Sequence, residues 1–258
     1  MKYYVIAGEA SGDLHGSNLL KALHQKDAQA NFRVWGGDKM AASGAKLVKH
    51  YKDLAFMGFV EVVKNLRTIL NNIAFCKKDI EAFKPDVLIL IDYPGFNLRI
   101  AKWAKTKNIR VFYYISPQLW AWHESRVKQI RRNVERMYVI IPFEKAFYLK
   151  HNMEVDFVGH PLKDVIDDFQ VSHNFTLQNE NKKAIALLPG SRTQEIKKVL
   201  PRMLEAVKAF PALHFVIAKA STMDISLYQE LIVKAEVSNV KIINDQTYNI
   251  LSLSLIHI

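Results

Sequence analysis

A single aspartate at the end of an apolar segment is the strongest candidate for a catalytic group in this sequence. Asp92 follows the segment VLILI and precedes a Pro-Gly pair, so it lies where a buried strand would turn into a helix. Beside Tyr93 and Phe96 its carboxylate would be partly desolvated, which is typical of a general base for a hydroxyl nucleophile. The spacing equally allows an aspartate that only stabilises its own turn.

A second polar cluster lies in AGEASGDLHG, residues 7–16. A strand, a Gly-rich turn and a helix usually bind phosphate, but an anion would be repelled by Glu9. A helix cap at Ser11 would leave Glu9 and His15 without a structural role. Polar groups of both signs favour sugar hydroxyls, so Glu9 and His15 are candidate sugar-binding residues.

The segment LLPGSRTQEI, residues 187–196, repeats the strand–turn–helix pattern late in the chain. Ser191 and Arg192 would open a helix whose backbone N–H groups and guanidinium suit a leaving diphosphate. A capping box with Glu195 would explain the serine but would give the arginine no task. Both residues are therefore candidate diphosphate ligands.

The aromatic and basic segment ISPQLWAWHESRVKQIRR, residues 115–132, is less specific. Trp and Arg together bind phosphate, sugars or nucleobases, although aromatic residues in such a turn more often pack the domain. Cys76 and the histidines show no metal-ligand spacing, so we expect no metal and no cofactor.

All these segments follow predicted strands. Apolar segments that alternate with helical ones predict a parallel sheet covered on both faces, and ligands bind beyond the carboxyl ends of such strands. The predicted strands are 3–7, 32–36, 87–91, 110–115, 138–141, 184–188, 214–218 and 240–243, with helices near 59–83, 97–107 and 122–136.

A polar stretch divides the pattern into two Rossmann-like domains. We predict an N-terminal domain over 1–165, a linker over 166–182 and a C-terminal domain over 183–258. The second domain is shorter than the roughly 100–150 residues of a common domain, and the chain stops in the apolar LSLSLIHI. We therefore expect the second domain to be incomplete, with its last residues not natural coding sequence.

The composition limits the partners. The chain has 36 Lys and Arg against 25 Asp and Glu, a net charge of +11, which favours an anionic partner such as nucleic acid, an acidic membrane face or a phosphorylated substrate. One cysteine excludes an internal disulfide and suits a reducing compartment. No apolar segment reaches the roughly 20 residues of a transmembrane helix, and no signal-peptide pattern is present.

Five ordered segments resemble those of the lipid-A-disaccharide synthases: AGEASGDLHG, DYPGFN, SPQLWAW, VGHPL and LLPGSRTQEI. The resemblance extends from Lys2 to about Leu251. It implies a B-type glycosyltransferase fold and an inverting transfer from UDP-2,3-diacylglucosamine to 2,3-diacylglucosamine 1-phosphate, giving lipid A disaccharide 1-phosphate and UDP. It also implies a Gram-negative bacterial protein that is cytoplasmic and peripheral on the anionic inner membrane.

The resemblance assigns roles to the candidate residues. Asp92 becomes the general base for the acceptor 6-hydroxyl, and Arg192 with Ser191 stabilises the departing UDP. Substrate binding falls to Glu9, Ser11, Gly12, His15 and Asn97. Because the family takes most uracil and ribose contacts from the part of the second domain expected to be missing, we expect little or no disaccharide synthesis by the 258 residues alone.

The stretch around Phe56, Met57, Phe59 and Val60 becomes a candidate membrane contact, with core packing as its alternative. Two other functions compete with the synthase. One is another B-type sugar-nucleotide enzyme such as a UDP-N-acetylglucosamine 2-epimerase. The other is a basic nucleic-acid-binding module, which no motif supports, so we expect no nucleic-acid partner. The oligomeric state is left open.

Overall fold

The computed structural model describes residues 1–54, 66–172, 184–221, 223–244, 246–253 and 256–257. The chain forms two compact units, Met1–Pro161 and Leu162–Ile258, which are described separately below. No helix in the described ranges is both long enough and apolar enough to span a membrane.

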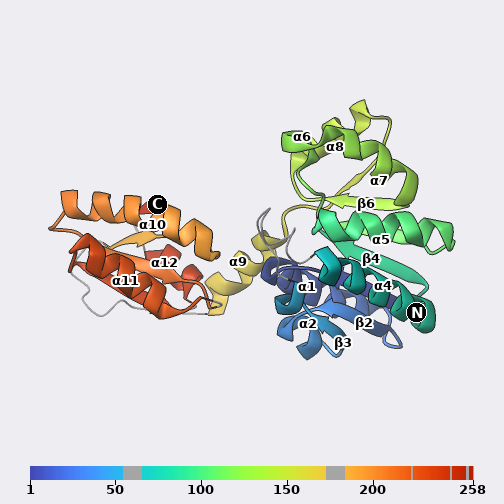
Figure 1. The fold of residues 1–258 in the computed structure, drawn as a ribbon, viewed down its shortest axis with the longest axis horizontal. Helices are drawn as coiled ribbons and strands as arrows, with labels where there is room; N and C mark the ends of the chain where they lie inside the picture. The colour runs from blue at the N-terminus through green and yellow to red at the C-terminus, as the bar shows by residue number, and fades with distance from the viewer. Residues whose placement is uncertain (55–65, 173–183, 222, 245, 254–255, 258) are drawn as a thin grey trace. The chain divides into compact units, whose positions relative to one another are not determined.

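The described part of the first unit contains a seven-stranded parallel sheet in the order β3-β2-β1-β4-β5-β6-β7 (Figure 1). Its strands are β1 (Lys2–Ala7), β2 (Asn31–Gly36), β3 (Lys46–His50), β4 (Val87–Ile91), β5 (Val111–Tyr114), β6 (Arg136–Val139) and β7 (Asp156–Phe157). Its helices are α1 (Ala10–Lys26), α2 (Asp38–Ala42), α4 (Leu66–Phe83), α5 (Pro94–Thr106), α6 (Leu119–Trp122), α7 (Val127–Asn133) and α8 (Pro142–Lys150), with 3-10 turns at Tyr51–Leu54 and Glu124–Arg126.

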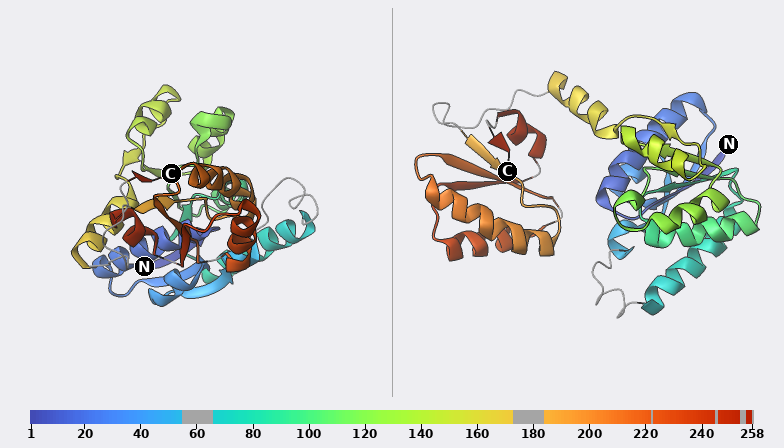
Figure 2. Two further views of the ribbon diagram at one scale, coloured as in Figure 1. Left: turned by 90° about the vertical axis from the view of Figure 1, so that its left-hand side faces the viewer. Right: turned by 90° about the horizontal axis from the view of Figure 1, so that it is seen from above.

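Both faces of this sheet are buried, which explains the nearly continuous apolar strands. Successive residues of β1 and β4 point to opposite faces of the sheet and belong to two hydrophobic clusters. Tyr4 and Leu88 pack on one face with residues of α4 and α5. Val5 and Ile89 pack on the other face with residues of α1 and α2. Figure 2 shows the same layered arrangement from two further directions.

The described part of the second unit contains a parallel sheet in the order β10-β9-β8-β11. Its strands are β8 (Ala184–Leu187), β9 (His214–Lys219), β10 (Val240–Asn244) and β11 (Ile256–His257). Its helices are α9, which begins at Pro161 and ends at Ser172, α10 (Thr193–Ala209), α11 (Ile225–Ala235) and α12 (Thr247–Leu253). The expected α/β class with two Rossmann-like units is therefore confirmed.

Several local predictions differ from the structure. The single helix expected over 122–136 is instead α6, a 3-10 turn and α7, and β6 begins two residues before the predicted strand. The expected linker is not irregular at its start, because α9 occupies 166–172. Apolar residues recur there at helical spacing, as Leu162, Val165, Ile166 and Phe169. Residues 55–65, with the proposed membrane contact at Phe56, Met57, Phe59 and Val60, lie outside the described residues.

The strand order creates a switch point between β1 and β4. From β1 the chain moves outward to β2 and β3, then returns to β4 on the other side of β1 and continues through β7. In such sheets ligands bind beyond the carboxyl ends of the strands at the switch point. Ala7 pairs with Ile91 in this register, so the loops that follow β1 and β4 start at the same level.

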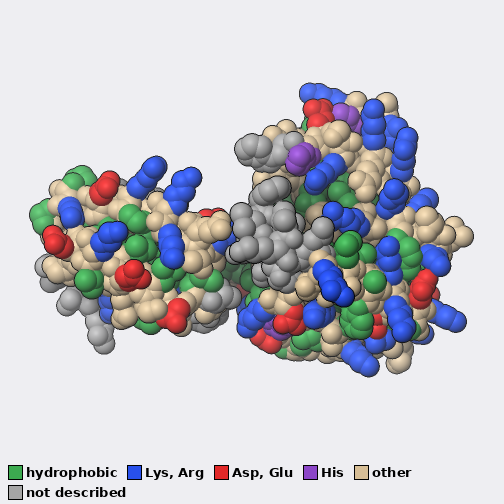
Figure 3. Space-filling model, viewed as in Figure 1, with side chains coloured by type: hydrophobic (Ala, Val, Ile, Leu, Met, Phe, Trp, Pro, Cys, Tyr) green, Lys and Arg blue, Asp and Glu red, His purple; other side chains and the backbone are tan. Residues whose placement is uncertain are grey.

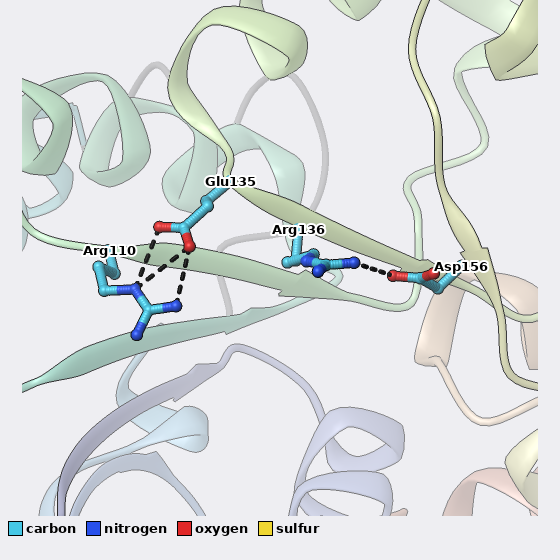
Figure 4. Close-up of polar contacts among 4 residues, drawn as sticks. All are labelled: Arg110, Glu135, Arg136 and Asp156. Carbon is cyan, nitrogen blue, oxygen red and sulfur yellow. Dashed lines mark hydrogen bonds and ion pairs between the residues drawn. The ribbon is translucent and has the colours of Figure 1, made fainter.

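Exposed ion pairs connect β5, β6 and β7 away from the carboxyl edge of the sheet. The guanidinium of Arg110, just before β5, donates hydrogen bonds of 2.9–3.2 Å to the carboxylate of Glu135, just before β6 (Figure 4). Arg136 in β6 pairs with Asp156 in β7 at 3.4 Å. Because Arg110 and Glu135 lie at the amino ends of their strands, this pair has a structural role.

Candidate active site

The loop after β1 and the loop after β4 are packed directly against each other. A Cβ atom at Gly8 would lie 2.4 Å from the ring of Tyr93, so only glycine fits at this position. Burial, and second the carboxylate of Glu9, raise the pKa of Tyr93. The structure thus brings the Glu9 segment and the Asp92 segment together at the switch point.

Asp92 and Tyr93 both have left-handed backbone conformations, with φ of 44° and 48°. Neither is glycine, and a non-glycine residue in this region costs on the order of 1–3 kcal/mol. The turn ends at Pro94, which is the first residue of α5 and suits that position because its missing N–H needs no partner there. The Asp92 side chain is half-buried, and Tyr93 stacks on the buried Phe96 with ring centroids 5.7 Å apart.

Asn97 is fully buried, and its side-chain amide is used within the protein. Its Nδ2 donates to the carbonyl oxygens of Ile91 at 3.2 Å and of Asp92 at 2.8 Å. The Tyr113 hydroxyl donates to the same Asp92 oxygen at 2.5 Å. Asn97 therefore has a structural role in the turn. This role was not expected from its prediction as a substrate-binding residue.

The structure differs from the expectation of a helix cap at Ser11. The N-cap residue of α1 is Glu9, and no side chain caps this end. Ser11 lies in the first turn and is exposed, whereas Gly12 is buried. A Cβ atom at Gly12 would lie 3.0 Å from that of Ala7. Gly12 therefore allows α1 to pack closely on the end of β1.

Asp13 has a tertiary role that the sequence does not reveal. Its buried carboxylate accepts N–H hydrogen bonds from Gly37 at 2.7 Å, Met40 at 3.0 Å and Lys39 at 3.1 Å. These donors belong to the start of α2, which has no capping side chain of its own. Asp13 therefore satisfies the first turn of α2, and it holds α2 against α1.

His15 is a buried imidazole at the same edge. Its side chain is 7% exposed, and its Nδ1 has no hydrogen-bond partner among the described residues. Burial, with a smaller effect of His160, lowers its pKa, so the ring is neutral near pH 7. A neutral imidazole with an unused nitrogen can exchange a hydrogen bond with a sugar hydroxyl.

A buried polar cluster lies beneath the aromatic segment after β5. The Ser116 Oγ is 2.6 Å from the Tyr148 hydroxyl. Glu144, 1% exposed, accepts the N–H of Ile141 at 3.0 Å. Burial raises the pKa of Glu144, and the N–H groups and hydroxyl around it only partly oppose the shift. Above the cluster, the exposed rings of Trp120 and Phe143 meet edge to face.

Glu144 leads to a pH-dependent stability. Because its pKa is higher in the folded than in the unfolded state, its contribution to stability is greatest below the unfolded pKa and falls as the pH rises through the folded pKa. We therefore expect the melting temperature of Glu144→Gln, relative to the parent, to increase as the pH is raised from 4.5 to 7.5. Thermal unfolding followed by circular dichroism measures it.

The matched control is Glu135→Gln, since Arg110 lowers the pKa of Glu135. Its effect should have the opposite sign: stability lost at neutral pH, with the loss disappearing as the pH falls. If the melting temperatures of Glu144→Gln and the parent differed by the same amount at every pH, burial would not raise the pKa of Glu144.

The second unit holds Ser191 and Arg192 after β8. Gly190 has φ of 102°, and Arg192 is the N-cap residue of α10 without a side-chain cap bond. The carboxylate of Glu195 accepts the Ser191 N–H at 3.2 Å and lies 3.6 Å from the Arg192 guanidinium. Glu195 thus gives Arg192 a partner, contrary to the expectation that capping would leave the arginine without one.

A buried lysine at the same edge was not predicted. Lys219 ends β9, the neighbour of β8, and is 7% exposed. Its Nζ donates to the carbonyl oxygens of Ala220 at 2.9 Å and Met223 at 2.5 Å. In the sequence Lys219 looks like any residue at the end of a strand. The fold shows that it ends the strand next to β8, which Ser191 and Arg192 follow. Among the described residues, no cluster of three or more metal-ligand side chains occurs.

The described fold resembles sugar-nucleotide enzymes of known structure. A UDP-GlcNAc 2-epimerase from Neisseria meningitidis bound to UDP-GlcNAc matches with a TM-score of 0.71, covering 100% of this chain and 77% of that one at 16% identity. The glycotransferase of kitacinnamycin matches with a TM-score of 0.62, covering 99% and 74% at 14% identity. At these identities the likeness concerns the fold alone, and it confirms the expected B-type fold.

Sequence relatives are more specific. The lipid-A-disaccharide synthase of Syntrophus aciditrophicus is 41% identical over 253 residues, 95% of this chain and 66% of that protein. That of Trichlorobacter lovleyi is 42% identical over 227 residues, 85% of this chain and 59% of that protein. The chain thus spans about 59–66% of the length of these relatives. The profile of the lipid-A-disaccharide synthetases matches residues 3–254, and the chain belongs to this family.

Proposed function

We propose that this chain carries the acceptor-activating half and part of the donor site of an inverting glycosyltransferase that makes lipid A disaccharide 1-phosphate. The substrates are UDP-2,3-diacylglucosamine and 2,3-diacylglucosamine 1-phosphate. The observation that supports it most is Asp92 at the switch point of the first sheet, on a backbone in an unfavourable conformation, in a chain of this family. Such conformations concentrate at functional sites.

The proposed reaction is a single displacement. The Asp92 carboxylate takes the proton of the acceptor 6-hydroxyl while that oxygen attacks the anomeric carbon of the donor from the face opposite UDP. The new C–O bond forms as the bond to the diphosphate breaks, and UDP leaves with the electron pair. Inversion at that carbon gives the β-1,6 linkage.

The departing diphosphate needs positive charge, which the second unit supplies. Arg192 and the N–H groups at the start of α10 are fixed hydrogen-bond donors, which stabilise the negative charge that develops on the diphosphate. Lys219 adds a buried cation at the carboxyl edge of the adjacent strand. Glu9, Ser11, Gly12 and His15 are proposed to bind the sugar of the acceptor, because they follow β1, whose loop packs against the Asp92 turn through Gly8 and Tyr93. Glu9, Ser11 and His15 carry side-chain groups that can exchange hydrogen bonds with sugar hydroxyls.

The reaction is tested in the full-length protein, in which this sequence is continued to the length of its curated relatives. Both acylated substrates are incubated with it, and the products are separated by thin-layer chromatography. We expect the disaccharide 1-phosphate and UDP in equal amounts. An epimerised UDP-sugar without disaccharide would favour the epimerase, whereas binding to RNA that weakens steeply with salt, without turnover, would favour a nucleic-acid module.

We also propose peripheral attachment to an anionic membrane on the cytoplasmic side. Leu70 and Phe75 of α4 are exposed apolar side chains, about half accessible, with the exposed cations Arg67 and Lys78 on the same helix. Lys and Arg also outnumber Asp and Glu over the visible face of the first unit (Figure 3). Apolar groups beside cations are typical of interfacial binding.

Flotation with phospholipid vesicles checks this attachment. We expect the full-length protein to float with vesicles that contain phosphatidylglycerol, and Leu70→Ser with Phe75→Ser to reduce the bound fraction several-fold. Leu149→Ser, an equally exposed apolar residue on α8, serves as the control for general loss of apolar surface. Equal binding to neutral vesicles, or an equal loss in the control, would contradict the proposal.

A further inference from the structure

The left-handed pair at Asp92 and Tyr93 must be held by its surroundings. Each residue has a Cβ atom that crowds its own backbone in this conformation, so two such residues in sequence are unfavourable unless other contacts stabilise them. A turn of the same length with ordinary backbone angles would direct the Asp92 carboxylate elsewhere. Contacts that exist only in the observed conformation therefore determine where that carboxylate lies.

Two buried donors make such contacts, and both use the same acceptor. The Tyr113 hydroxyl from β5 and the Asn97 Nδ2 from α5 both donate to the main-chain oxygen of Asp92, at 2.5 and 2.8 Å. Both side chains are 0% exposed. The Asp92 N–H is also fixed, because it donates to the Tyr114 carbonyl at 3.2 Å. Both the N–H and the main-chain oxygen of Asp92 are therefore held by hydrogen bonds.

The donors are themselves rigid. Tyr113 lies in the centre of the sheet, where β5 pairs with β4 on one side and β6 on the other. Burial raises its pKa well above the usual range, so its hydroxyl stays protonated and remains a donor at any physiological pH. Asn97 is anchored by its second bond, from the same Nδ2 to the Ile91 carbonyl at 3.2 Å.

We infer that Tyr113 and Asn97 are positioning residues for Asp92: through its main-chain oxygen they keep the turn left-handed and thereby aim the carboxylate at the acceptor hydroxyl. This inference rests on the proposed role of Asp92 as the general base. A carboxylate displaced by an ångström or tilted by tens of degrees transfers its proton poorly, because geometric errors of this size lower rates by up to about 10²-fold. Neither donor touches substrate in this role.

The test is Tyr113→Phe in the full-length protein, which removes one oxygen and keeps the ring. We expect kcat to fall roughly 10- to 100-fold with the KM of both substrates changed little. Tyr4→Phe is the matched control. Tyr4 lies in β1 and is also 0% exposed, but its hydroxyl donates to Asp79 and accepts the Trp35 Nε1–H instead of bonding the Asp92 turn. It should lower the melting temperature but leave kcat unchanged.

A double-mutant cycle separates positioning from general packing. If Tyr113 acts through Asp92, then Tyr113→Phe in an Asp92→Asn background causes no further loss of kcat, because the group it aims is already gone. An equal loss in both backgrounds, or a normal kcat for Tyr113→Phe alone, overturns the inference while the role of Asp92 stands. Normal kcat for Asp92→Asn instead overturns the proposed base and the inference with it.

A second variant tests the positioning role without relying on Tyr113→Phe alone. Asn97→Leu has nearly the same shape and removes the other donor to the Asp92 oxygen. We expect a loss of kcat similar to that of Tyr113→Phe, again absent in the Asp92→Asn background. Should either variant fold poorly, shown by a lost cooperative melt, the other decides the outcome by the same criterion.

Discussion

Asp92→Asn lowers kcat of the full-length protein by about 10²–10⁴-fold, the expected result if Asp92 is the general base. Asparagine keeps the shape and the backbone contacts of the turn but cannot accept the proton of the 6-hydroxyl. The KM values should change little, because the group acts in the transition state. Initial rates of UDP release at saturating substrates measure the effect.

The matched control for this substitution lies at the other end of the same strand. Asp86 precedes β4, is exposed, and accepts the Lys2 N–H at 2.7 Å. Asp86→Asn therefore removes an equal charge from β4 at the amino edge of the sheet, and its kcat should equal that of the parent. Near-normal turnover of Asp92→Asn would remove Asp92 from the base role, whereas equal losses in both variants would point to a general effect of charge.

Arg192→Gln is expected to have the second largest effect, a loss of about 10²–10³-fold in kcat/KM for the UDP-sugar. If Arg192 binds the diphosphate as proposed, its guanidinium faces the negative charge that grows there as the anomeric bond breaks, and glutamine loses most of this stabilisation. The KM of the acceptor should stay the same, since Arg192 belongs to the other unit. Steady-state kinetics with each substrate varied in turn measures both values.

Arg202→Gln controls for the loss of positive charge. Arg202 is exposed and lies in the same helix, about two turns beyond its start. Its substitution should leave kcat/KM within a factor of two of the parent at a fixed ionic strength. If Arg192→Gln behaved like this control, the diphosphate would have to be bound elsewhere, and Lys219 would be the first residue to test.

The layout of the fold was predictable because it depends on local signals. Apolar segments such as VLILI are buried on both faces of a parallel sheet, and strong turn residues such as Pro94 and Gly190 mark the helix starts. The carboxyl ends of strands were therefore located well, and with them Asp92 and Arg192. Sheet order was not predictable, since it depends on which strands pair.

The errors concern residues whose partners are distant in the sequence. Asp13 lies in the first turn of its own helix, but the three N–H groups that donate to it come from residues 37–40. Tyr113 reads as an ordinary strand residue, and nothing local marks the hydroxyl that reaches Asp92. The first residues of the expected linker, 166–172, form part of α9 although their composition is polar, because a surface helix needs only one apolar stripe.

The contact between Gly8 and Tyr93 has a consequence for how this protein tolerates change. Any side chain at position 8 must displace the Tyr93 ring, and that ring belongs to the residue directly after Asp92. The end of β1 and the turn that contains Asp92 therefore constrain each other, although they lie far apart in the sequence. Substitutions at the end of β1 or in the Asp92 turn are therefore tolerated only when position 8 remains glycine.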